Sequence, residues 1–356
     1  MKKTNGSIRL CGDFSTGLND VLETHQYPLP APEDLFSKLN GGTIFSKIDF
    51  SDAYLQLEVH ESSRALVTIN THRGLYQYNR LPFGLKCAPA IFQQVMDTML
   101  AGLPFAMAYM DDIIVVSSTA EDHIHHLRSV FSRILDFGFK VRPEKCCFML
   151  SSIRYLGSIV DSQGRRPDPE KIQAIISMPS PSNVSELQSF LGLINYYGHF
   201  VSNMHNLRVP LNALLSPNAE WNWSKECQES FLAIKRLLTS DLLLTHYNPR
   251  FPIVVAADAS EQGIGAVILH RFPSGAEKAV YHASRSLSVS ERNYSQIEKE
   301  ALALVLAVKK FHKMLHGRKF ILQTDLKSLL AIIGSKRHSS SHSQPLTTLG
   351  YHFTEL

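Results

Sequence analysis

Two short apolar segments flank a pair of adjacent acidic residues about a third of the way along the chain. Residues 105–109 and 113–116 are rich in strand-forming side chains, and Asp111 and Asp112 lie between them. This pattern predicts a β-hairpin with two carboxylates at its bend. Two like charges beside buried strands are costly unless they are paired, so a bound divalent cation would stabilise them. An ordinary solvated turn is the alternative interpretation.

A second apolar segment also ends in an acid. Residues 43–48 form a predicted strand, Asp49 ends it, and a helical turn follows. If this strand lies beside the hairpin in one sheet, the Asp49 carboxylate comes close to Asp111 and is aimed at the same metal. A helix cap is the alternative role, because Asp caps helices well.

The remaining segments before residue 250 mix strands with amphipathic helices. Residues 1–20 predict the start of a hairpin at Asn5-Gly6, with Lys2, Lys3 and Arg9 either meeting phosphates or simply solvated. An Asn183-x-x-Glu186 capping box predicts the start of a helix. The predicted strand pairs lie within 66–80 and 153–160, and the predicted helices at 33–39, 88–100, 121–137, 168–178, 183–200, 210–215 and 224–238.

The last third of the chain carries three further acids at element ends or on a helix. A strand at 251–258 ends in Asp258 and returns at 264–270. A helix over 297–315 places Glu300 on an apolar face, and a strand at 319–324 ends at Asp325. Taken singly, these acids also fit a solvated turn, a surface glutamate and a helix cap.

Composition limits the class of protein. The chain has 356 residues, 44% hydrophobic and 19% charged, which predicts a globular protein of two or three domains. Its net charge of +4 permits a nucleic-acid partner without requiring one. Its five cysteines form no Cys-x-x-Cys pair, so neither a zinc site nor a disulfide framework is indicated. No signal peptide or membrane-length apolar run is evident, which predicts a soluble, intracellular protein without membrane contact.

Several motifs together resemble the polymerase of gypsy-type LTR retrotransposons. Tyr109-Met110-Asp111-Asp112 looks like the polymerase box of reverse transcriptases. The further matching motifs are Ile48-Asp49-Phe50 with Asp52-Ala53-Tyr54, Leu81-Pro82-Phe83-Gly84-Leu85 with Ala88-Pro89 and Phe92-Gln93, and Tyr155-Leu156-Gly157. Leu191 to Tyr197 resembles the connection region of the same family. Gly198-His199 stands where two basic residues usually follow, which weakens an expected contact with a nucleic-acid backbone.

The third region resembles the ribonuclease H domain of the same elements, in Asp258-Ala259-Ser260, Tyr294, Glu298-Lys299-Glu300 and Thr324-Asp325. It departs from the family at Leu326, where a His is usual, and the family's fourth acidic position is missing. The first part of the fingers is also missing. Residues 336–356 no longer resemble the family and predict a polar, poorly ordered tail.

The resemblance implies an α+β multidomain fold, with a right-hand polymerase of fingers, palm and thumb followed by a connection and an RNase H-like α/β domain. The expected domains are a reverse transcriptase fingers and palm at 1–165, a mostly helical thumb and connection at 166–249, an RNase H-like domain at 250–335 and the divergent tail at 336–356.

The resemblance also implies roles for individual residues. Two Mg²⁺ ions per active site are expected, with Mn²⁺ as an alternative. The catalytic, metal-binding acids would be Asp49, Asp111 and Asp112 in the polymerase, and Asp258, Glu300 and Asp325 in the ribonuclease H. The nucleotide-binding residues would be Arg9, Lys3, Tyr54, Phe83, Gln93 and Met110, with Tyr54 as a gate against the ribose 2′-hydroxyl. Leu156 and Gly157 would form the primer grip.

The implied function is an RNA-directed DNA polymerase with ribonuclease H activity, acting in the cytoplasm or a virus-like particle. Its expected partners are an RNA template, a DNA primer, dNTPs, an RNA–DNA hybrid and other Gag or Pol products. The alternative is a truncated, catalytically inactive remnant that at most binds nucleic acid. A cellular DNA-templated polymerase would leave the third region unexplained.

Overall fold

The computed structural model describes residues 11–324 except 16, 24, 203, 217, 218 and 241, together with 329 and 347–351. The predicted roles of Lys3, Arg9 and Asp325, and the hairpin at Asn5-Gly6, lie outside the described residues. The chain divides into two compact units, 1–153 and 154–356, which are described separately below. None of the described helices has the length and apolar character needed to cross a membrane.

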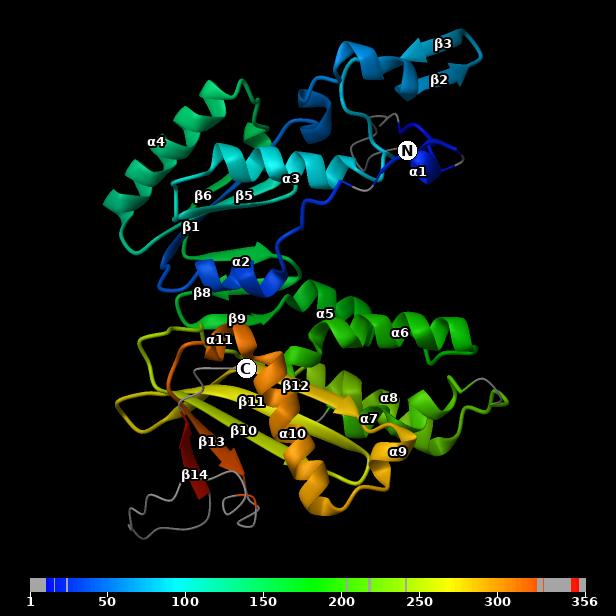
Figure 1. Cartoon of the computed structure of the whole chain (residues 1–356), viewed down its shortest axis with the longest axis vertical. Coiled ribbons are helices and arrows are strands. Elements are labelled where there is room, and N and C mark those ends of the chain that lie inside the picture. Colours follow the sequence, from blue (N-terminus) through cyan, green and yellow to red (C-terminus); the bar gives the residue numbers. More distant parts are fainter. Residues whose placement is uncertain are drawn as a thin grey trace. The chain divides into compact units, whose positions relative to one another are not determined.

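The first unit is built on a four-stranded antiparallel sheet of order β4-β5-β1-β6, covered on one face by helices α3 and α4 (Figure 1). Buried side chains of both helices pack on Ile48 and Ile113 of the sheet, so the neighbouring residues Asp49 and Asp112 lie on the opposite face. The strands are β1 (Ile44–Asp49), β4 (Ala106–Tyr109), β5 (Asp112–Ser117) and β6 (Cys147–Leu150), and the helices are α3 (Ala88–Met99) and α4 (Ala120–Asp136).

Shorter elements complete the first unit. The β2–β3 pair lies within the strand pair predicted at 66–80 and turns at residues 72 and 73, and α2 ends before Gly41, whose φ of 75° suits glycine. These elements are α1 (Leu18–Val21), α2 (Pro32–Lys38), β2 (Thr68–Thr71), β3 (Gly74–Gln77) and the 3₁₀ helices η1 (Ala53–Gln56), η2 (Glu61–Val67) and η3 (Pro143–Lys145).

The second unit begins with a small sheet and a helical layer. The sheet has order β7-β8-β9, and the helices share one core of buried side chains that includes Leu187, Phe190 and Phe231. The elements are β7 (Ser152–Tyr155), β8 (Ser158–Asp161), β9 (Gly164–Pro167), α5 (Pro169–Ile176), α6 (Val184–Tyr197), η4 (Gly198–Phe200), α7 (Met204–Ala213) and α8 (Lys225–Leu238).

A five-stranded mixed sheet of order β12-β11-β10-β13-β14 follows in the same unit. Strands β10 and β13 are parallel and the other pairs antiparallel, while α10 packs on Val255 and Ala257 of β10 (Figure 1). The elements are β10 (Ile253–Ala259), β11 (Gly263–Arg271), β12 (Glu277–Ser286), α9 (Val289–Arg292), α10 (Gln296–Lys310), α11 (His312–Leu315), β13 (Phe320–Thr324) and β14 (Thr347–Tyr351).

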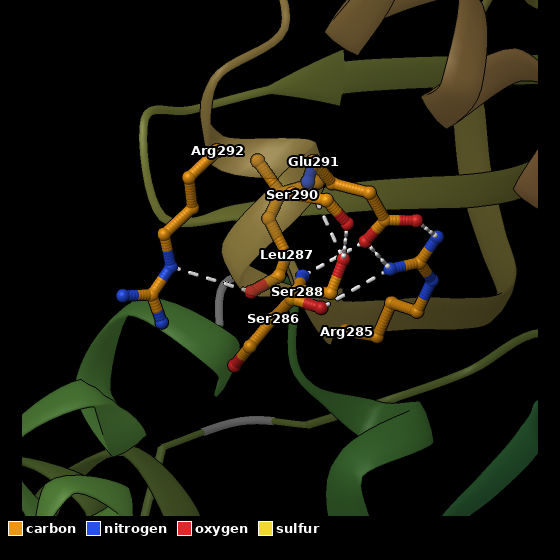
Figure 2. Close-up of polar contacts among 7 residues, drawn as sticks. All are labelled: Arg285, Ser286, Leu287, Ser288, Ser290, Glu291 and Arg292. Carbon is orange, nitrogen blue, oxygen red and sulfur yellow. Dashed lines mark hydrogen bonds and ion pairs between the residues drawn. The ribbon is translucent and has the colours of Figure 1, made fainter.

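The corner between β12 and α10 is fixed by charge-assisted hydrogen bonds (Figure 2). Arg285 donates to both oxygens of Glu291 at 2.7 and 2.9 Å, and Glu291 also accepts from the Ser288 backbone in a capping box. Arg292 donates to the Leu287 carbonyl at 3.3 Å. The Arg285 bonds lower the pKa of Glu291 to about 2, so this carboxylate stays ionised.

The structure corrects several predicted elements. Helix α7 starts at Met204 rather than 210 and contains Pro210, because burial of Met204 and Leu211 outweighs the missing N–H. The predicted helix to 315 stops at Lys310 and resumes as α11. At α6, Asn183 accepts from the Glu186 N–H as predicted, but the Glu186 carboxylate accepts from Ser182 instead of completing a capping box.

The division into two compact units falls after residue 153, within the expected first domain of 1–165. Arg165 and Leu244 exchange backbone hydrogen bonds of 2.7 and 2.9 Å, which ties β9 to the second unit. Within the expected tail at 336–356, Thr347–Tyr351 forms β14 along the edge of β13. The expected domain limits stay predictions.

Candidate active sites

Two strand ends bring acids together in the first unit. Asp49, the last residue of β1, lies directly opposite Asp112, the first residue of β5, in the antiparallel ladder. Asp111 lies in the turn between β4 and β5, and its carbonyl accepts from the Phe50 N–H at 3.4 Å. Met110 in the same turn has a φ of 54°, so the bend uses a left-handed residue without glycine or asparagine.

A pocket of about 260 Å³ opens beside these strand ends. It contains two of the predicted acids, Asp49 and Asp111, and the two predicted nucleotide-contacting aromatics, Tyr54 and Phe83, whose ring centroids are 5.1 Å apart. Asp112 is not among its lining residues. The full lining is Asp49, Phe50, Asp52, Ala53, Tyr54, Phe83, Asp111, Arg142 and Lys145.

The pocket also contains two cations, Arg142 and Lys145, to which the sequence analysis assigned no role. The Lys145 Nζ atom lies 3.9 Å from Asp49 Oδ2, and Arg142 lies 3.6 Å from Asp52. The Arg142 N–H also donates to the Asp49 carbonyl at 2.8 Å, which holds this segment against the end of β1. A contact across almost a hundred residues leaves no local pattern in the sequence.

The carboxylates carry a desolvation cost. Burial raises the pKa of Asp49, which Lys145 counteracts and the nearby charge of Asp111 reinforces. Burial also raises the pKa of Asp112, whose main compensation is the Lys47 ammonium 2.6 Å from its Oδ2 atom. Asp112 therefore has its own cation, while Asp49 and Asp111 face the pocket together.

The donor set at the pocket fits a hard divalent cation. Mg²⁺ prefers oxygen ligands and usually takes one or two carboxylates, completing its shell with water and substrate phosphates. Asp49 and Asp111 supply such a pair. Within the described part of the chain, no three His, Cys, Asp or Glu side chains gather as a metal-holding group. A pair of carboxylates open to a substrate pocket is thus the candidate metal site.

Gln93 supports the acidic turn from within the core. Its side chain is fully buried, it donates to the Ala108 carbonyl at 2.9 Å, and it accepts from the Met110 N–H at 2.8 Å. These contacts support the acidic turn, and the nucleotide contact expected for Gln93 stays a prediction. The predicted primer-grip residues Leu156 and Gly157 form the turn between β7 and β8 in the second unit.

The second acidic site is only partly described. Asp258 is exposed near the end of β10 and lines a cavity of about 240 Å³ with His282 and Thr324. Glu300 on α10 is 2% exposed and accepts from the Ala259 N–H at 3.3 Å and from Gln296 at 2.9 Å. Both predicted acids therefore lie at the same end of β10.

Helix α7 contacts the turn that follows Asp258. The buried His205 Nε2 atom lies 3.4 Å from Ser260 Oγ, and that hydroxyl accepts from the Gly263 N–H at 3.1 Å. A Cβ atom on Gly263 would lie 2.1 Å from the His205 ring. Burial lowers the pKa of His205. Sequence reasoning missed this histidine, since nothing local links it to β10.

His199 also has a role that the sequence did not indicate. Its ring stacks on the ring of Tyr281 in β12, with the two ring centroids 5.2 Å apart. Burial lowers the pKa of His199 to about 3. The residue that replaces an expected basic side chain is thus a neutral packing group.

Comparison with known families adds two matches. Residues 1–160 match the family described as reverse transcriptase (RNA-dependent DNA polymerase). Residues 223–322 match the family described as an RNase H-like domain found in reverse transcriptase.

Two of the curated relatives of the chain are transposon polyproteins. It is 34% identical over 315 residues to the retrovirus-related Pol polyprotein from transposon 297 of Drosophila melanogaster, covering 88% of this chain and 29% of the relative. It is 30% identical over 335 residues to the transposon Tf2-3 polyprotein of Schizosaccharomyces pombe, and the match covers 93% of this chain and 25% of that relative. The chain belongs to the reverse transcriptase and RNase H region of retrotransposon Pol polyproteins. It spans less than a third of the length of these relatives.

Solved structures of foamy viral reverse transcriptases share the fold of this Pol region. The protease-reverse transcriptase dRH in complex with ds DNA matches with a TM-score of 0.86 and 24% identity, covering 93% of this chain and 58% of that one. The protease-reverse transcriptase in complex with RNA/DNA hybrid matches with a TM-score of 0.75 and 24% identity, covering 85% and 41%. The predicted α+β fold, with a reverse transcriptase followed by an RNase H-like domain, is confirmed.

Proposed function

We propose that this Pol region is an RNA-directed DNA polymerase that also hydrolyses RNA in RNA–DNA hybrids. The observation that carries the proposal is the pocket in which Asp49 and Asp111 face Tyr54 and Phe83. Nucleotidyl transfer requires charge neutralisation and positioning of the substrate. The paired acids would bind the cation, and the aromatic wall would position the sugar and base. The foamy viral relatives of this fold were solved with double-stranded DNA and with an RNA/DNA hybrid, which supports nucleic acid as the partner.

In polymerisation, the primer 3′-hydroxyl attacks the α-phosphate of a dNTP and pyrophosphate leaves. Bound Mg²⁺ supplies charge neutralisation for the attacking and leaving oxygens. Asp49 and Asp111 would hold the cation, and Asp112 would stay paired with Lys47. Tyr54, braced 5.3 Å from the Phe92 ring, forms the wall that excludes a ribose 2′-hydroxyl. Lys145 partly offsets the burial that raises the pKa of Asp49 and so favours its ionised form.

In hydrolysis of the hybrid, Asp258, Glu300 and Asp325 form the acidic set, with Mg²⁺ as the expected cation. Glu300 is oriented by the Ala259 N–H and by Gln296, so its carboxylate is tied to the strand that carries Asp258. The hybrid would be recognised by its backbone and shape, since phosphate and sugar contacts carry no sequence information.

The test is extension of a DNA primer on an RNA template by the full chain, with Mg²⁺ and with EDTA. Cleavage of a labelled RNA–DNA hybrid is followed in parallel with wild type and Asp258→Asn. Extension and cleavage that both need Mg²⁺, with cleavage lost in Asp258→Asn, support the proposal. A folded, monodisperse chain that neither extends nor cleaves contradicts it and favours the inactive remnant.

A further inference from the structure

The turn between β7 and β8 holds two successive residues in the left-handed region. Leu156 has a φ of 44° and Gly157 a φ of 66°. The left-handed conformation is sterically disfavoured for leucine, and it persists only when the surroundings hold it. This turn therefore needs partners outside itself.

Those partners come from the last turn of helix α6. The Tyr196 hydroxyl donates to the Leu156 carbonyl, and the Tyr197 hydroxyl donates to the Gly157 carbonyl at 3.3 Å. The two rings meet edge to face, with centroids 5.0 Å apart. A third donor, the Asp168 N–H at the start of α5, also reaches the Gly157 carbonyl at 3.0 Å. Three hydrogen bonds thus fix the two carbonyls of the turn.

The contact leaves little room for a side chain at position 157. A Cβ atom there would lie 3.2 Å from the Tyr197 hydroxyl and 3.3 Å from the Tyr196 ring. Tyr197 is 4% exposed, and burial raises its pKa to about 12, so its hydroxyl remains a donor at neutral pH. Tyr196 is 41% exposed, so its hydrogen bond to the turn borders solvent.

We propose that Tyr196 and Tyr197 are positioning residues that fix the Leu156–Gly157 turn on the end of α6, so that the turn meets the end of a primer in one defined conformation. The primer contact itself rests on the proposed function, whereas the hydroxyl clamp rests on the contacts above. The clamp links the turn to helix α6 within the second unit.

The test compares Tyr196→Phe, Tyr197→Phe and the double variant, which keep both rings and remove only the hydroxyls. Tyr247→Phe is the matched control, because the Tyr247 hydroxyl also donates to a backbone carbonyl of the same unit, that of Met314 at 2.6 Å. Amide exchange over 155–158 reports the clamp without any need for catalysis. Affinity for a labelled DNA primer on an RNA template, and the KM for dNTP, report its consequence.

The double variant is expected to exchange these amides about tenfold faster and to bind primer–template about tenfold more weakly, with an unchanged KM for dNTP. Tyr247→Phe is expected to match wild type in amide exchange, in affinity for primer–template and in the KM for dNTP. Unchanged exchange in the double variant overturns the clamp, and faster exchange with unchanged primer affinity overturns its positioning role. A wild-type chain that binds primer–template without extending it refutes the polymerase proposal and leaves the clamp result standing.

Discussion

Asp49 and Asp112 face each other across β1 and β5, yet only Asp49 shares the pocket with Asp111. Like charges directly opposite each other in a sheet are destabilising, and the Lys47 ammonium at 2.6 Å neutralises Asp112. The same side-chain type therefore has two roles. Asp112 is held in an ion pair with Lys47 outside the pocket, while Asp49, 3.9 Å from Lys145, and Asp111 both line the pocket that a cation would enter.

Mg²⁺ is expected to stabilise the chain against heat, because it relieves the repulsion between Asp49 and Asp111. A ligand at a hundred times its Kd contributes about 2.7 kcal/mol. Differential scanning calorimetry with and without Mg²⁺ measures the shift in the midpoint of the transition that contains the first unit. Asp111→Asn should lose most of the shift, whereas Asp136→Asn, on the exposed end of α4, should keep it. Equal shifts in both variants would rule out this pocket as the cation site.

Tyr54→Ala is expected to admit ribonucleotides, because the substitution removes the ring that packs 5.1 Å from Phe83 at the edge of the pocket. Discrimination between dNTP and rNTP, measured as a ratio of kcat/KM, should fall by about tenfold or more. Tyr54→Phe keeps the ring and should keep the discrimination. A Tyr54→Ala enzyme as selective as wild type would refute the gate.

Gly263→Ala is expected to destabilise the second unit by about 1–3 kcal/mol, since its Cβ atom would collide with the His205 ring at 2.1 Å and the Arg285 carbonyl at 2.8 Å. Urea unfolding measures the loss. Gly192→Ala is the control, because nothing lies within 4 Å of its Cβ position in α6 and alanine favours a helix. A Gly263→Ala variant as stable as wild type would show that α7 does not pack against the β10–β11 turn as described.

The local pattern predicted the elements that carry the acids, because alternation and strand-end acids are encoded within a few residues. β1, the β4–β5 hairpin and β10 were found in this way. The partners of these elements were not found. Arg142 reaches Asp49, and His205 reaches Gly263, across long stretches of chain, and such contacts leave no periodic signal.

His199 shows the same limit in a different form. From the sequence, it stood out only as a departure from a basic pair beside the paired tyrosines of α6. In the structure its ring lies against Tyr281, which belongs to a strand that the sequence pattern did not single out. Comparing His199 with the residue usual at its position in the family does not reveal its contact with Tyr281, because tertiary packing makes that contact.

His199 is expected to make the second unit acid-sensitive. The pKa of His199 is about 3 in the folded chain and about 6.5, the ordinary value for histidine, in the unfolded chain. Between these two pH values the unfolded chain therefore binds a proton at His199 and the folded chain does not. Stability therefore falls as the pH drops through this window, by about 2 kcal/mol between pH 7 and pH 5 for this one group. His199→Phe, which keeps the stacking, should lose less stability in urea unfolding between these two pH values. The exposed His316→Phe should behave as wild type, and an unchanged loss in His199→Phe would contradict the assignment.

The most direct test of the polymerase pocket is extension of a DNA primer on an RNA template by Asp111→Asn, beside wild type and Asp136→Asn. All three chains are first shown to be folded by circular dichroism and gel filtration. The account predicts extension by wild type and by Asp136→Asn, and a loss of at least a thousandfold in Asp111→Asn, on the order expected when a group essential to transition-state stabilisation is removed. Extension by Asp111→Asn near the wild-type rate would contradict the role of this carboxylate.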